Sequence, residues 1–283
     1  MRLVDTLRDL LIATRSQVVL TAGTIVEVST PLFERSGKPG VMSLLHRLEM
    51  LPHIWRRTVD LEERELVTAV RSLSDHTQYR APPPFVSSYL DTLLNLDPHA
   101  RMLYASASVS QMIWDIAYAG GRVPSTSRHA ATFENWVELN RTDVAAAQGR
   151  RTYLGELRHA YTRKIRNLLE PHTPSDGRMD FDLLGAHLWD RPDWCPALRL
   201  SFEVIQLFFR DRRTRSTESD MNDFSRMLSV PYVDVFTADA AKRDYLRTLR
   251  EGKQSRLRGC SYWSSARVAA GLDEVLELLA AAT

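Results

Sequence analysis

The segment from 219 to 246 constrains the fold more than any other part of this sequence. Residues 232–237 (YVDVFT) are rich in β-forming types and stand between two stretches with helical spacing, 220–230 and 240–249. β-Branched and aromatic residues favour strands. A strand between two helices at this spacing is typical of a parallel sheet covered by helices. The sequence therefore predicts an α/β fold with a parallel sheet.

The rest of the chain divides by its periodicity into two mixed ends and a helical middle. The first eighty residues predict strands at 18–20 and 53–59 and helices at 3–15, from 24 onward, at 41–51 and at 60–73. After the breaker Ala81-Pro82-Pro83-Pro84, the predicted helices are 86–95, 98–119, 129–147, 150–169, 181–188 and 196–212. A short edge strand at 262–263 and a helix at 272–279 close the chain. We expect residues 1–80 and 196–283 to be the two halves of one α/β domain, and residues 81–195 to be a large all-helical insertion.

Four aspartates surround the predicted strand. Asp220 and Asp223 are three positions apart and share one helix face. Asp234 lies within the strand, where an unpaired carboxylate is costly to bury. Asp239 follows the strand at its carboxyl end, where α/β sheets bind ligands. Carboxylate oxygens suit Mg²⁺ or Mn²⁺, but the same residues also fit two helix caps and an arginine partner for Asp234.

The pattern D-x-x-D-F-x6-P-Y-V-D-V-F-x-x-D, residues 220–239, resembles the C-terminal half of PIN-like nuclease domains, in particular long bacterial members with a helical insertion. That family shows an acidic helix start, a strand with Tyr-x-Asp and a Thr-x-Asp turn. Here 232–234 matches the strand and 237–239 the turn. Asp223 is the better match for the helix acid, with Asp220 beside it in the same role.

A looser likeness runs through the N-terminal part. Residues 17–30 resemble the second strand of the family and the helix after it, and Glu27 takes the position of an acid on that helix. The alternative is a solvated glutamate. The family normally opens with an Asp-bearing strand, and no such strand precedes Gln17, because Asp5 lies in a helical pattern. A start site placed too far downstream, a truncated chain or a natural variant without that ligand would each explain the difference.

The resemblance implies hydrolysis of a phosphodiester in RNA or DNA by carboxylates that hold one or two Mg²⁺ or Mn²⁺ ions. The metal would activate a water and neutralise charge at the phosphate. Asp223 and Asp239, helped by Glu27, would be metal ligands. Asp220, also a candidate ligand, and Asp234 would bind through water or orient the other carboxylates.

Further residues of this region are candidates for holding the substrate. Thr237 could contact a water on the metal or a phosphate. Arginines next to phosphate give affinity that does not depend on sequence, and four of them precede the acidic segment: Arg210, Arg212, Arg213 and Arg215. A solvated basic face explains the same run equally well.

Other classes of function lack support in the sequence. No HExxH, GxGxxG, GxxxxGK[ST] or GxSxG motif occurs, and the two cysteines are far apart, which argues against a zinc site or a disulfide framework. No run approaches the roughly 18 apolar residues of a membrane span, so we expect a cytoplasmic protein without a membrane partner.

The leading hypothesis is a metal-dependent endoribonuclease acting as a toxin or defence component, with a protein antitoxin or a second copy of the chain as a further partner. One alternative is a catalytically inactive protein of the same fold that binds nucleic acid or protein. In another, the helical middle carries the function and the α/β part is a scaffold.

Overall fold

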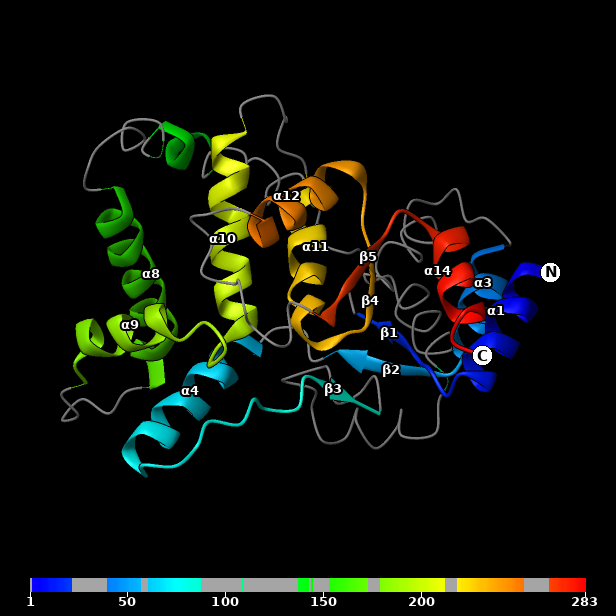
Figure 1. Cartoon of the computed structure of the whole chain (residues 1–283), viewed down its shortest axis with the longest axis horizontal. Coiled ribbons are helices and arrows are strands. Elements are labelled where there is room, and N and C mark those ends of the chain that lie inside the picture. The colour runs from blue at the N-terminus through cyan, green and yellow to red at the C-terminus, as the bar shows by residue number, and fades with distance from the viewer. Residues whose placement is uncertain are drawn as a thin grey trace, which may run out of the picture. The chain divides into compact units, whose positions relative to one another are not determined.

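The computed structural model describes residues 2–21, 40–56, 61–87, 108, 137–142, 144, 153–172, 179–211, 218–251 and 265–283. These residues are mostly helical and also form a three-stranded mixed sheet and a two-stranded parallel sheet (Figure 1). The predicted α/β class is therefore confirmed. The chain divides into two compact units, one made of residues 1–59, 83–128 and 271–283, the other of residues 60–82 and 129–270.

The first unit contains the mixed sheet and three described helices. Strand β1 (Val18–Leu20) is parallel to β2 (His53–Arg56), with Val19 opposite Ile54, and β3 (Phe85–Val86) pairs antiparallel with β2. The helices are α1 (Arg2–Ala13), α3 (Gly40–Glu49) and α14 (Leu272–Ala280). Leu11, Leu51 and Leu279 are buried together, so the two ends of the chain share one small core.

The sequence predicted these elements with one error. The helices at 3–15, 41–51 and 272–279 and the strand at 18–20 are confirmed to within a few residues. The strand predicted at 53–59 is confirmed over His53–Arg56, and its last three residues lie outside the described residues. The helix predicted from residue 86 is wrong at its start, because Phe85 and Val86 form β3 and the predicted all-helical segment thus contains a strand. Prolines 82–84 disfavour a helix at this point, and Phe85 and Val86 pair with the edge of β2. The helices predicted from residue 24 and at 98–119 fall almost entirely outside the described residues.

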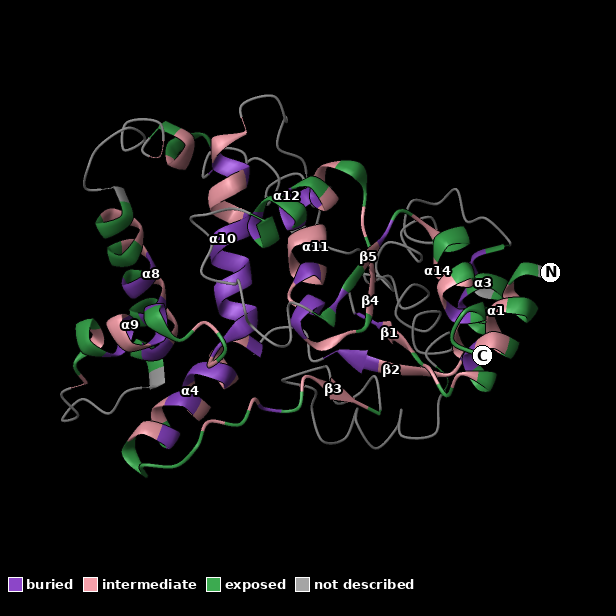
Figure 2. Ribbon diagram, viewed as in Figure 1, coloured by how far each residue is buried: buried purple, intermediate pink, exposed green. Residues whose placement is uncertain are grey.

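The second unit is built around helix α10 (Pro196–Arg210), which is buried along most of its length (Figure 2). Leu200, Val204 and Phe208 are spaced four residues apart and face one hydrophobic cluster, while Leu198 and Phe202 face a second one. The second cluster joins α10 to α4 (Leu61–Ser74), α8 (Tyr153–Leu169), which continues into the 3₁₀ turn Glu170–His172, and α9 (Phe181–Asp190).

The first cluster joins α10 to the part of the chain that carries the acidic motif. Its elements are α11 (Glu218–Met227), the 3₁₀ turn Val230–Tyr232, β4 (Val235–Thr237), α12 (Ala240–Glu251) and β5 (Arg267–Ala269). Strands β4 and β5 are parallel, with Phe236 opposite Val268. The prediction of a parallel strand between two helices is confirmed here.

Two details of the predicted strand are wrong. Tyr232 lies in a 3₁₀ turn and not in the strand, because Pro231 has no N–H to donate to a sheet and its φ suits the turn. Asp234 precedes β4 and is exposed, and its backbone oxygen accepts a hydrogen bond of 2.8 Å from Arg267 N. Asp234 is therefore not a buried carboxylate. The edge strand predicted at 262–263 lies outside the described residues.

A buried carboxylate caps the start of helix α10. Glu65 on α4 is completely buried, and its two oxygens accept hydrogen bonds of 3.0 Å each from Ala197 N and Leu198 N in the first turn of α10. The hydroxyl of Tyr232 donates to Glu65 as well. First-turn N–H groups have no partner within their own helix, so Glu65 supplies one from another helix. Burial outweighs these hydrogen bonds and raises the pKa of Glu65 to about 8.

Among the helices that the structure describes, none is both long enough and apolar enough to cross a lipid bilayer.

We expect the substitution of glycine by alanine to have opposite effects on stability at two positions, Gly185 and Gly155. A Cβ at Gly185 on α9 would lie 2.8 Å from the Cβ of Thr162 on α8, whereas a Cβ at Gly155 would meet nothing within 4 Å. Gly185→Ala should lower the free energy of unfolding by about 1–3 kcal/mol through overpacking. Gly155→Ala should raise it by about 0.5–1 kcal/mol through helix propensity. Urea denaturation of both variants tests this, and a neutral Gly185→Ala would contradict the close approach of α8 and α9.

The raised pKa of Glu65 leads us to expect that the stability of the protein depends on pH. Its pKa is raised in the folded state, so its contribution to stability is complete below about pH 4.5 and is lost as the pH rises through about 8. Over this window the free energy of unfolding of the wild type should fall relative to that of Glu65→Gln, by at most about 1.4 kcal/mol per pH unit. Urea denaturation from pH 5 to 9 measures the difference. Glu63→Gln on the same helix is the control and should follow the wild type; parallel curves for wild type and Glu65→Gln would refute the assignment.

Candidate carboxylate site

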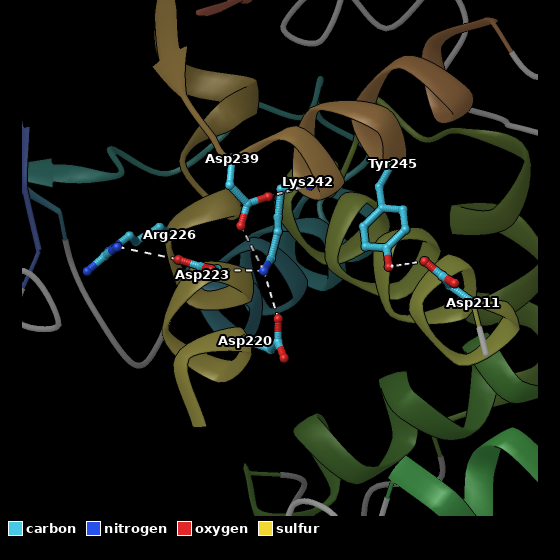
Figure 3. Close-up of polar contacts among 7 residues, drawn as sticks. All are labelled: Asp211, Asp220, Asp223, Arg226, Asp239, Lys242 and Tyr245. Carbon is cyan, nitrogen blue, oxygen red and sulfur yellow. Dashed lines mark hydrogen bonds and ion pairs between the residues drawn. The ribbon is translucent and has the colours of Figure 1, made fainter. Parts of the chain in front are cut away.

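The second unit brings three of the predicted acidic residues together. Asp220 and Asp223 lie on α11, and Asp239 lies between the end of β4 and the start of α12. All three side chains point toward Lys242 in the first turn of α12 (Figure 3). We call Asp220, Asp223, Asp239 and Lys242 the carboxylate–lysine cluster.

The ammonium group of Lys242 is the centre of this cluster. Its Nζ atom lies 2.7 Å from Asp220 Oδ1, 3.0 Å from Asp223 Oδ2 and 3.1 Å from Asp239 Oδ2. An ammonium has three N–H donors, so each of its hydrogens can meet a different carboxylate. Asp223 is also 3.4 Å from Arg226, which contacts its other oxygen, Oδ1. Among the described contacts, two cations, Lys242 and Arg226, meet these three carboxylates.

Burial within the cluster falls from one side to the other. The side chains of Lys242 and Asp220 are 9% and 5% exposed, that of Asp223 is 24% exposed, and that of Asp239 is 54% exposed. The cluster therefore has a closed end at Asp220 and a side open to solvent at Asp239.

The pKa values of two members follow from these contacts. Burial works against the charged form of Lys242, but its hydrogen bonds to Asp220 and Asp223 outweigh burial and raise its pKa. For Asp239, partial burial acts to raise the pKa, and hydrogen bonds from the backbone and ammonium of Lys242 outweigh it and lower the pKa. Both groups are thus held in their charged forms.

Asp239 also caps helix α12. Its Oδ1 accepts a hydrogen bond of 2.8 Å from Lys242 N, while its Oδ2 faces Lys242 Nζ. The sequence left open whether Asp239 is a helix cap or part of a site. It does both, because the two oxygens of one carboxylate serve different partners.

A second polar contact helps to hold α12 in place. The hydroxyl of Tyr245 donates to Asp211 Oδ2 at 3.0 Å (Figure 3). Arg141 Nη2 donates to the backbone oxygen of Asp211 at 3.1 Å. Asp211 directly follows α10, so the bond from Tyr245 ties α12 to the end of the buried helix.

The other predicted site residues lie elsewhere or outside the described residues. Asp234 and Thr237 are exposed; Asp234 precedes β4 and is at the opposite end of that strand from Asp239, whereas Thr237 ends β4 two residues before Asp239. Arg210 is the last residue of α10, and burial lowers its pKa. Four predicted site residues lie outside the described part of the chain: Glu27, Arg212, Arg213 and Arg215.

Lys242 is the member that the sequence analysis missed. One signal was available, since Asp239 and Lys242 are three positions apart across the start of a helix, a spacing at which opposite charges meet. The contacts of Lys242 with Asp220 and Asp223 join α12 to α11 and have no local sequence signal.

The donors of the cluster fit a hard divalent cation in chemistry but not in their present spacing. Carboxylate oxygens are the ligands that Mg²⁺ and Mn²⁺ prefer. Nevertheless, no three Asp, Glu, His or Cys side chains in the described part of the chain are grouped so that they could hold a metal ion as they stand. The Lys242 ammonium lies between the three carboxylates.

No protein-family model, no curated protein and no solved structure matches this chain.

Because Asp239 both caps α12 and contacts Lys242 Nζ, we expect two substitutions to separate the contributions of these contacts to stability. Asp239→Ala removes the cap and should lower the free energy of unfolding by about 1 kcal/mol. Asp239→Ser keeps an oxygen for Lys242 N but none for Lys242 Nζ, and should restore most of that loss. Thermal unfolding of both variants is the measurement. Equal destabilisation by Ala and Ser would show that the contact with Nζ, and not the cap, accounts for the stability.

Proposed function

We propose that this protein is a divalent-metal-dependent nuclease of the PIN-like type, most simply an endoribonuclease. The observation that carries the proposal is the convergence of Asp220 and Asp223, from one helix, and Asp239, from the turn between β4 and α12, on a single cation. The resemblance of residues 220–239 to PIN-like domains supports the same chemistry, and a PIN-like sheet built by both ends of the chain is part of the proposal.

In this proposal the three aspartates hold Mg²⁺ or Mn²⁺. Glu27, a further ligand that the resemblance implies, lies outside the described residues. A bound divalent ion would supply positive charge at the phosphate and lower the pKa of a water. Asp239 and Asp223 lie on the open side of the cluster, where a phosphodiester can approach from solvent. Asp220 is buried and positions the ion from the closed side.

Two further groups serve the substrate in this proposal. Thr237 is exposed two residues from Asp239 and can donate its hydroxyl hydrogen to a phosphate oxygen. The arginine run that starts at Arg210 and includes Arg212, Arg213 and Arg215 would hold the nucleic-acid backbone through contacts independent of sequence. Asp234 is not assigned a role in catalysis, because it lies at the far end of β4. RNA is the first substrate to test and DNA the second, and a toxin or defence role in the cytoplasm would follow from cleavage of cellular RNA.

One observation favours a second candidate function. Lys242 already meets all three carboxylates, so the cluster is held together without a metal ion. A chain of this kind can bind nucleic acid or a protein partner without cutting it. The two candidates differ in one respect: a nuclease cleaves the bound nucleic acid when a divalent ion is added, whereas a binding protein leaves it intact.

Cleavage assays on a panel of RNAs, with matched single-stranded and double-stranded DNAs, test the proposal. We expect cleavage with Mg²⁺ or Mn²⁺ and none with EDTA. Asp223→Asn and Asp239→Asn should each lower the rate by at least roughly 100-fold, since each removes a ligand charge. Asp244→Asn is the matched control, because Asp244 lies on α12 but pairs with the exposed Arg247. Cleavage that persists in EDTA, or in the two Asn variants, would contradict the assignment, and binding without any cleavage would favour the second candidate.

A further inference from the structure

We draw no further inference here: the strongest candidate, the side-chain cluster of Glu62, Lys164 and Ser201 where α4, α8 and α10 meet, carries no new site, because the ion pair of 2.7 Å with Glu62 favours the charged form of Lys164, which cannot act as a base toward Ser201.

Discussion

The buried carboxylate of Glu65 at the start of α10 is the contact on which the second unit depends. It accepts hydrogen bonds from Ala197 N and Leu198 N, whose helix otherwise offers them no partner. Helix α10 forms part of both hydrophobic clusters, so the placement of α4, α8 and α9 on one face and of α11 and α12 on the other follows from its position. Tyr232, from the acidic segment, binds the same carboxylate and joins that segment to the core.

The carboxylate–lysine cluster is a consequence of this framework. Helices α11 and α12 both pack on α10, which brings Asp220 and Asp223 opposite the first turn of α12. Three carboxylates so close together repel one another, and Lys242 offsets that repulsion at their centre. The same negative charge that requires the lysine is what would attract a divalent ion. The stability of the fold without metal and the proposed affinity for metal therefore have one electrostatic origin.

Local patterns predicted most of the described elements. The helices at 3–15, 150–169, 196–212 and 240–249 have apolar residues at helical spacing, and the structure contains each of them to within a few residues. The errors lie where a neighbour in sequence or space overrides propensity. Tyr232 has a β-forming side chain, but Pro231 keeps it in a turn and its hydroxyl finds Glu65. Phe85 follows three prolines and joins a sheet whose other strands lie more than twenty residues earlier.

What the sequence alone determined is the α/β class, the parallel strand between two helices and the candidacy of Asp220, Asp223 and Asp239, because periodicity and spacing along one chain segment carry that information. Only the tertiary structure decided that these three carboxylates meet at Lys242 and that Asp234 faces solvent. The physical reason is that an ion pair between two helices depends on how both pack on a third. Helix spacing sets which residues share a face, but packing on α10 sets which faces meet.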